Sequence, residues 1–352
     1  MDDQEKIKIM VIDDNVTNLN VIRKALEKYY DVLLFTTGKA ALKLFERMIP
    51  DLILLDVDMP GMDGFEVMKQ IKKSPYPVHD IPVIFVTAMT DSESEYDGLT
   101  LGAVDYITKP FSYTLLLKRI ELHLQLQHYS RHLENMVEEK TKTISELQYA
   151  IIRVMSDMVE QRDGFTGLHL IHTQSYLEVL LSEVKKEHLY EEELIQKDEQ
   201  QFINASQLHD IGKISIPDYI LLKPGKLTYE EFEVMKSHAN LGEKAIRNVM
   251  KGIHDIRFLE IAAAFAGTHH EWWDGSGYPR ALCGLDIPIE GRLMAIVDVY
   301  DALVSQRPYK KAFSHEEATA IIISESGTHF DPLLISAFEQ VAPVFKTISQ
   351  GK

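Results

Sequence analysis

The sequence predicts a protein of two domains, a doubly wound α/β domain followed by an all-α domain, with a long helix between them. Three patterns support this prediction. Residues 6 to about 125 alternate short apolar runs with helical patterns, residues 111–163 contain no glycine or proline, and apolar residues after about 150 recur at helical spacing. We therefore expect an α/β domain over 1–125, a helical linker over 126–158 and an all-α domain over 159–352.

The secondary structure is predicted from apolar periodicity. In the first part the predicted strands are residues 6–12, 32–35, 52–55, 83–86 and 106–107, and the predicted helices are residues 16–29, 38–48, 64–73 and 92–101. Strands that alternate with helices form a parallel sheet covered on both faces. In the second part, helical periodicity without strand alternation covers residues 168–184, 200–211, 229–250, 257–268, 290–304 and 315–323.

The composition excludes several classes of function. A formal net charge of −17 over 352 residues leaves no broad basic surface, so we expect neither a nucleic-acid polymer as partner nor a DNA-binding output. The single cysteine, Cys283, excludes a disulfide framework and a thiolate metal site. The first residues lack a signal-peptide pattern and no apolar run reaches membrane-spanning length, so we expect a cytoplasmic protein without a membrane partner.

Apolar residues in the predicted long helix recur at steps of three and four residues, with charged residues between them. This seam consists of Leu126, Tyr129, Leu133, Met136, Ile144, Leu147, Ile151, Val154 and Met158. It favours a homodimeric coiled coil, because the seam is longer than the helix that either domain needs for its own packing. The alternative is a helix packed along its own domains, and Lys140 interrupts the seam.

Acidic residues follow two of the predicted strands. Asp13 and Asp14 end the first strand, Asp56 ends the third, Thr87 ends the fourth and Lys109 follows the fifth. Parallel strands end at one edge of the sheet, where ligands bind in doubly wound folds. Clustered carboxylates attract a hard divalent cation such as Mg²⁺, while the Thr87 hydroxyl and the Lys109 ammonium suit the oxygens of a phosphoryl group on Asp56.

These residues resemble the receiver domain of two-component response regulators, which has a flavodoxin-like fold. The matching motifs are VIDDN at 11–15, LLDVDMPGMDG at 54–64, VTA at 86–88, Tyr106 and TKP at 108–110. The resemblance implies that a sensor histidine kinase is the partner and that Asp56 accepts the phosphoryl group. It also implies that Asp14, Asp56 and the Asp58 carbonyl bind Mg²⁺, with help from Asp13. Thr87 and Tyr106 would form the switch pair, and the Lys109–Pro110 peptide bond would be cis.

The second half contains histidines and aspartates that together suit a pair of transition metals. They are His169, His209, Asp210, His238, His269, His270 and Asp298. Neutral imidazole binds such metals, an aspartate can bridge two of them, and two metals can clamp a phosphodiester. Singly, each has an ordinary explanation, and adjacent His269 and His270 would point different ways on a helix.

The same segments resemble the HD-GYP family of HD metal-dependent phosphohydrolases, from about 160 to 332. The motifs are EQRDGFTGLH, LHDIGKISIPDYILLKPGKLT, HHEWWDGSGYP, DVYDALVSQRPYK and THFDP. The resemblance implies hydrolysis of cyclic di-GMP to pGpG, to GMP or to both. Sites of histidine and aspartate accept iron, manganese or nickel, so any of these could be the metal. The resemblance also implies that Asp210 bridges the two metals, that His238, His269 and His270 bind one of them, and that His169, His209 and Asp298 bind the other. Asp210 and Lys213 would be catalytic. The substrate would be bound by Tyr278, Arg307 and Lys310.

Two positions depart from the family pattern. Phe165 stands where some members have a glutamate for a third metal, so we expect two metals, with Glu160 or a water as the possible substitute. His172 stands where the family usually has arginine, one turn after His169, and a surface or packing role is favoured over a ligand role.

Three alternatives to the phosphodiesterase are less favoured by the sequence. A signalling adaptor would bind a cyclic dinucleotide or a protein without useful turnover, but the complete ligand set and the retained Lys213 favour an enzyme. A phosphohydrolase that acts on mononucleotides is disfavoured by the complete Gly277–Tyr278–Pro279 motif. A DNA-binding output lacks a basic recognition helix.

Overall fold

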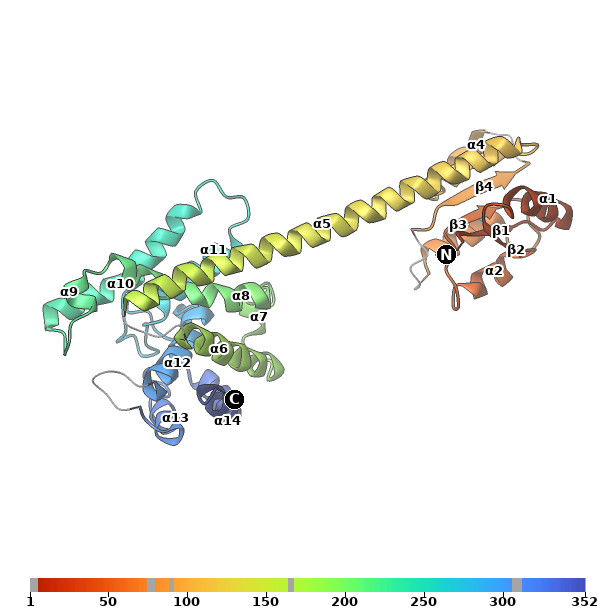
Figure 1. Cartoon of the computed structure of the whole chain (residues 1–352). Coiled ribbons are helices and arrows are strands. Elements are labelled where there is room, and N and C mark those ends of the chain that lie inside the picture. The colour runs from red at the N-terminus through yellow and green to blue at the C-terminus, as the bar shows by residue number, and fades with distance from the viewer. Residues whose placement is uncertain (1–5, 75–79, 89–91, 164–167, 306–311, 352) are drawn as a thin grey trace. The chain divides into compact units, whose positions relative to one another are not determined.

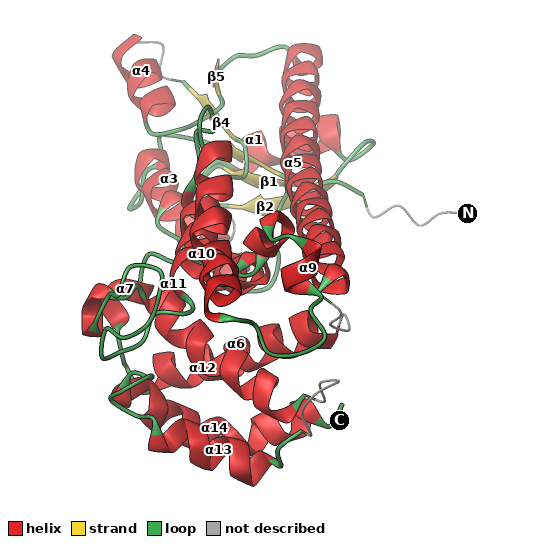
Figure 2. Ribbon diagram, turned by 90° about the vertical axis from the view of Figure 1, so that its left-hand side faces the viewer, coloured by secondary structure: helices red, strands yellow, loops and turns green. Residues whose placement is uncertain are grey.

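The computed structural model describes residues 6–74, 80–88, 92–163, 168–305 and 312–351. The chain divides into two compact units, Met1–Lys142 and Thr143–Lys352. Figure 2 shows the strands in the first unit, while the described part of the second unit is helical apart from one bridge between Ser326 and Phe330. The predicted fold class, α/β then all-α with a long helix between, is confirmed.

The first unit is a parallel sheet with helices on both faces. Its strands are β1 (Lys8–Ile12), β2 (Asp31–Phe35), β3 (Leu52–Leu55), β4 (Val83–Thr87) and β5 (Asp105–Thr108), in the order β2-β1-β3-β4-β5. Its helices before the linker are α1 (Val16–Leu26), α2 (Gly38–Leu44), α3 (Gly64–Lys72) and α4 (Ser92–Thr100). Successive residues of β1 enter opposite cores: Met10 and Ile12 pack on one face, and Ile9 and Val11 on the other.

The linker is part of one continuous helix, α5, which runs from Tyr113 to Arg162 over 50 residues (Figure 1). The absence of glycine and proline predicted this continuity. Leu116 and Ile120 pack into the core of the first unit, and Ile152 packs against the core of the second. All nine predicted seam residues of this helix are exposed. No helix in the described part of the chain is both long and apolar enough to cross a membrane.

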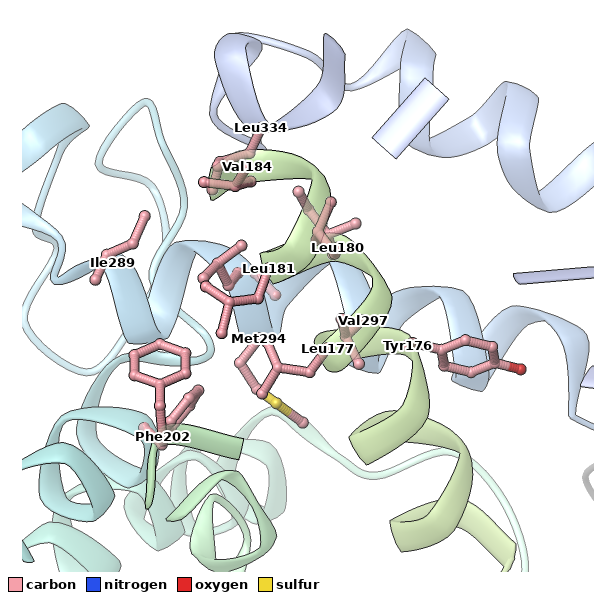
Figure 3. Packing of buried hydrophobic residues seen from close by; sticks show 14 of the residues in the cluster. Tyr176, Leu177, Leu180, Leu181, Val184, Phe202, Ile289, Met294, Val297 and Leu334 are labelled. Atoms are coloured by element: carbon pink, nitrogen blue, oxygen red, sulfur yellow. The ribbon is translucent and has the colours of Figure 1, made fainter. Parts of the chain in front are cut away.

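The second unit is built from helices of different lengths around one large core, with a smaller apolar cluster around Ile216 and Ile220. The helices are α6 (Leu168–Lys186), α7 (Glu191–Leu194), α8 (Glu199–Ala205), η1 (Ser206–Leu208), η2 (Ile211–Ser215), α9 (Asp218–Leu221), α10 (Tyr229–Val249), α11 (Arg257–Thr268), η3 (Gly284–Asp286), α12 (Ile289–Val304), α13 (His315–Ser324) and α14 (Pro332–Ser349). Figure 3 shows part of the large core, where Leu177 and Leu181 of α6 lie near Met294 of α12.

Two predictions about this unit were wrong. The helix predicted over 200–211 ends at Ala205 and gives way to the 3₁₀ turns η1 and η2. In η2, Gly212 approaches the backbone of α10 so closely that a Cβ built on it would lie 1.9 Å from the His238 carbonyl oxygen. Helix α14 was not predicted, although it supplies Leu334 and Phe338 to the core.

Candidate metal centre

The predicted metal ligands come from five places in the second unit. His169 lies on α6, His209 and Asp210 join η1 to η2, His238 lies on α10, His269 and His270 follow α11, and Asp298 lies on α12. The side chains are deeply placed: His209 is 0%, His269 1% and His238 2% exposed. His269 is the C-cap of α11, which ends at Thr268, and ligand atoms of both His269 and His270 belong to the same cluster, contrary to the ordinary explanation of adjacent helical histidines.

Two clusters of ligand atoms share Asp210. In one, atoms of Asp210, His238, His269 and His270 lie within 4.8 Å of one another, and in the other the atoms of His169, His209 and Asp210 do so. Asp210 Oδ1 is 3.3 Å from His238 Nε2, and Asp210 Oδ2 is 3.3 Å from His209 Nε2. The Asp298 carboxylate adjoins the second cluster, with Oδ1 3.7 Å from His169 Nε2. The two oxygens of one carboxylate therefore face different groups of imidazoles.

Four of these histidines are oriented in the same way, through Nδ1. The Nδ1 atoms of His209, His238 and His269 donate to the carbonyl oxygens of Ser206 (2.8 Å), Met235 (2.7 Å) and Phe265 (3.0 Å). His169 Nδ1 donates to Asp301 Oδ2 at 2.7 Å. A proton on Nδ1 leaves the lone pair of a neutral imidazole on Nε2, the atom that faces the cluster.

The ring nitrogens and carboxylate oxygens that face the cluster are arranged as they would be around a bound cation. His209 Nε2 and Asp210 Oδ1 are buried and have no hydrogen-bond partner in the described part of the protein. His238 Nε2 and His269 Nε2 lie 3.4 Å apart, and two lone pairs at that distance repel unless a cation or a proton lies between them. Imidazole nitrogens and carboxylate oxygens in this ratio fit divalent transition metals, so the donor set fits the metals that the sequence implies.

The two clusters differ in their affinity for protons. Burial would lower the pKa of His209, but the negative charges of Asp210 and Asp298 outweigh it and raise this pKa to about 9. Burial lowers the pKa of His238 to about 4, and it holds the pKa of His270 well below its usual value. Burial would raise the pKa of Asp210, but Lys213 and His209 keep it well below its usual value, so this carboxylate stays charged.

These pKa values predict different pH dependence for the two metal positions. Below about pH 9 a cation at His209 must displace a proton, so affinity there should rise with pH, about tenfold per unit for one displaced proton. The pKa values of His238 and His270 are lowered, so these two ligands release no proton near neutral pH and affinity at their position should depend less steeply on pH. Calorimetric manganese titrations at several pH values, in buffers of different ionisation enthalpy, would resolve the two steps. Equal pH slopes for both steps would contradict this prediction.

Asp301 and the position of His172 were not anticipated as part of the site. Asp301 lies one helical turn after Asp298 on α12, is 1% exposed, and anchors His169. Its other oxygen lies 3.4 Å from His172 Nδ1, which places His172 beside the anchor of a ligand and outside both ligand clusters. The spacing of the two aspartates in DVYDAL was the available signal.

The predicted catalytic and substrate-binding residues are only partly within the described structure. Lys213 Nζ lies 2.7 Å from Asp210 Oδ2 and 2.7 Å from Asp163 Oδ2. The Tyr278 ring lies 4.7 Å from the His270 ring between centroids, beside the metal cluster. Arg307 and Lys310, and also Phe165, lie outside the described residues.

One further carboxylate is buried beside the cluster. Glu160, near the end of α5, is 2% exposed, and both of its oxygens lack a hydrogen-bond partner in the described structure. Burial raises its pKa, and the nearby charge of His169 opposes this effect. An unpaired buried carboxylate is costly, so its environment favours a proton or a cation at this position.

The first unit places its predicted acidic and switch residues at one edge of the sheet. Ligand oxygens of Asp13, Asp14 and Asp56 lie within 4.8 Å of one another. Lys109 Nζ lies 2.7 Å from Asp13 and 2.9 Å from Asp56, and burial raises the pKa of Asp56 against the effect of Lys109. Thr87 Oγ1 donates to Asp58 at 3.4 Å, Tyr106 is buried, and the Lys109–Pro110 bond is cis, as expected.

Comparison with known proteins identifies both units. The HD domain family matches residues 132–334, and the response regulator receiver domain family matches residues 9–121. A Vibrio cholerae protein named "Probable cyclic di-GMP phosphodiesterase" is 42% identical, over 96% of this chain and 78% of that protein. The cyclic di-GMP phosphodiesterase response regulator RpfG of Xanthomonas campestris pv. campestris is 34% identical, over 97% and 92%. A cyclic di-GMP phosphodiesterase of Thermotoga maritima is 36% identical, over 94% and 89%.

The fold and the buried cluster define a response regulator in which a receiver domain is joined to an HD domain with a buried group of histidines and aspartates suited to metal ions. The chain belongs to the family of cyclic di-GMP phosphodiesterase response regulators, since these relatives match it over nearly its whole length.

Proposed function

We propose that this protein hydrolyses cyclic di-GMP at a two-metal centre in its helical unit, under the control of phosphorylation at Asp56. The position of Asp210 carries the proposal, because one carboxylate belongs to two clusters of imidazoles. The relatives that match nearly the whole chain are named as cyclic di-GMP phosphodiesterases, which supports the choice of substrate. The alternative is an adaptor that binds a cyclic dinucleotide or a protein without turnover.

The ligand set divides between two cations. His238, His269 and His270 would hold one, and His169, His209 and Asp298 the other, with Asp210 between them. Iron, manganese or nickel at these positions would polarise a phosphodiester and lower the pKa of water. In the reaction a water oxygen forms a bond to phosphorus, the bond from phosphorus to the 3′-oxygen breaks, and the 3′-oxygen takes up a proton. One such step opens the ring to pGpG, and a second gives GMP.

Lys213 and Tyr278 are the described residues that we assign to the substrate. Burial would lower the pKa of Lys213, but Asp210 and Asp163 raise it, so the ammonium stays charged and can contact a phosphate oxygen. Burial raises the pKa of Tyr278, so this side chain stays a neutral phenol that can donate a hydrogen bond or stack on a base. Arg307 and Lys310 complete the proposed phosphate contacts on the family resemblance alone.

Product analysis tests this function. Protein loaded with Mn²⁺ or Fe²⁺ is incubated with cyclic di-GMP, and the products are resolved by chromatography. We expect pGpG, GMP or both, and a purified protein with two metals per chain rather than three. A metal-loaded protein that binds cyclic di-GMP and forms no product would favour the adaptor.

Phosphorylation at Asp56 is proposed to control turnover. Mg²⁺ held by Asp14, Asp56 and the Asp58 carbonyl would offset the charge added to Asp56, Lys109 already contacts that carboxylate, and Thr87 and Tyr106 would form the switch. We expect beryllofluoride, an acyl-phosphate mimic, to change the turnover of the full chain, the dimer population formed through the α5 seam, or both. Turnover assays and sedimentation of the same samples measure the two effects.

The control for this prediction is Asp56→Asn, which keeps the size of the side chain and removes the oxygen that accepts the phosphoryl group. The variant should keep its basal turnover and lose the response to beryllofluoride. If wild-type turnover and oligomeric state are both unchanged by beryllofluoride, the proposed control by the receiver is wrong.

A further inference from the structure

The last turn of α5 contacts the loop that carries the catalytic residues. Arg162 donates from Nη1 to the carbonyl oxygens of Lys213 (3.1 Å) and Ile214 (2.8 Å), and from Nη2 to that of Ile216 (2.7 Å). Its Nε and Nη2 also donate to Asp218 Oδ1 at 3.0 and 2.7 Å. The guanidinium therefore binds two carbonyls within η2, the carbonyl of the residue that follows η2, and the carboxylate of the first residue of α9.

These contacts fix the path of the loop more firmly than its own hydrogen bonds can. Within η2 the described backbone bonds include Lys213 N to Asp210 O at 2.9 Å and Ile216 N to Lys213 O at 3.0 Å. A short 3₁₀ turn has poor hydrogen-bond geometry and is weak on its own. Charge-assisted hydrogen bonds from a planar, forked cation add both strength and direction.

Asp163, the residue directly after α5, extends this contact to the metal centre. Asp163 Oδ2 lies 2.7 Å from Lys213 Nζ, and the same Nζ lies 2.7 Å from Asp210 Oδ2. The path from α5 to the shared metal ligand therefore consists of two ion pairs. Arg162 holds the backbone of Lys213, and Asp163 holds the end of its side chain.

We propose that Arg162 and Asp163 are positioning residues, which hold Lys213 and through it Asp210, and that the last turn of α5 is where the state of the receiver domain reaches the metal centre. This inference rests on the proposed function. The same helix begins at Tyr113 in the receiver unit and ends at Arg162. A small rotation or shift of its last turn would displace the catalytic loop, and a misplacement of about 1 Å can reduce a rate about 100-fold.

The test compares Arg162→Ala and Arg162→Lys with Arg153→Ala in the full-length, metal-loaded protein. Arg153 is an exposed arginine on the same helix and provides the matched control. We expect kcat for cyclic di-GMP to fall about 10- to 100-fold in Arg162→Ala, to recover partly in Arg162→Lys, and to stay at the wild-type value in Arg153→Ala. Metal content should remain two per chain in all of them.

Hydrogen exchange of the amides of residues 211–216 gives a readout that does not depend on turnover. Exchange should be faster in Arg162→Ala than in wild type or Arg153→Ala, and beryllofluoride should alter it in wild type but not in Arg162→Ala. Unchanged exchange in Arg162→Ala would overturn the positioning role. An effect of beryllofluoride on turnover without any change at 211–216 would overturn the signal route.

The two proposals fail separately. If wild-type protein does not hydrolyse cyclic di-GMP, the proposed function fails, while the exchange measurement still decides whether Arg162 holds the loop. If Arg162→Ala does not fold, Asp218→Asn serves in its place, because it weakens two of the hydrogen bonds of Arg162 and leaves the three carbonyl contacts in place. That variant should show a smaller increase in exchange at 211–216, and no increase would count against the proposal.

Discussion

Replacing Asp210 by asparagine should reduce cyclic di-GMP turnover by at least about a thousandfold, as expected when a central catalytic group is lost. The carboxamide keeps the size of the side chain but presents only one oxygen, whereas Asp210 directs one oxygen toward His238 and the other toward His209. We therefore expect less than two metals per chain in the variant. Product chromatography and metal analysis of purified protein measure the two effects.

The fold should survive this substitution, because Lys213 keeps its ion pair with Asp163. Circular dichroism would verify this, and Asp286→Asn, at an exposed aspartate of η3, provides the control. If Asp210→Asn retains substantial turnover with both metals bound, Asp210 is not the bridging ligand and the two-metal arrangement is wrong.

Gly212→Ala should produce the second large effect, on both stability and metal binding. A Cβ at Gly212 would lie 1.9 Å from the His238 carbonyl oxygen and 2.6 Å from the Gly242 nitrogen, and neither backbone atom can move without α10. Overpacking of this kind costs about 3 kcal/mol or more. For a unit of this size that corresponds to a fall in Tm of roughly 6–12 °C. Thermal unfolding followed by calorimetry would measure it.

The metal should be lost together with the stability, since the clash separates the loop that carries Asp210 from the helix that carries His238. Gly242→Ala, on the other side of the same contact, is the graded control. Its Cβ would meet the Gly212 nitrogen at 3.1 Å and Ala266 Cβ at 3.4 Å, which requires only small shifts. The higher helix propensity of alanine, about 1 kcal/mol, offsets part of that cost. Equal Tm values for Gly212→Ala and wild type would show that the loop tolerates a side chain there.

Much of the fold could be predicted because its signals are local. The alternation of strands and helices in the first unit and the unbroken helix α5 follow from periodicity and from the absence of glycine and proline over 111–163. The two errors have identifiable physical causes. The helix after residue 199 breaks so that Gly212 can approach α10, and α14 contains Pro343, which argues against a helix when only the sequence is considered.

The candidate metal ligands were also named from sequence, because each lies in a distinctive motif. What the motifs could not show is how a pair such as His269 and His270 shares one cluster, since this depends on α11 ending at Thr268. The anchoring role of Asp301 was likewise missed, although its spacing from Asp298 was visible. The role of Arg162 was missed because three of its partners are backbone carbonyls, which every residue has, and the fourth, Asp218, lies 56 residues away in the sequence.

The sequence by itself determined which chemical groups this protein has: paired carboxylates after strands, a set of imidazoles and aspartates, and a continuous helix between the two units. These follow from residue types and local spacing, which act over a few residues. Only the tertiary structure decided which nitrogen of His169, His209, His238 and His269 faces the centre. It also decided that Asp210 is shared by two clusters and that Arg162, at the end of α5, contacts the loop after Asp210. Those outcomes depend on hydrogen bonds and packing between segments up to 132 residues apart, as with His169 and Asp301, and such pairings form only when the helices pack around their common core.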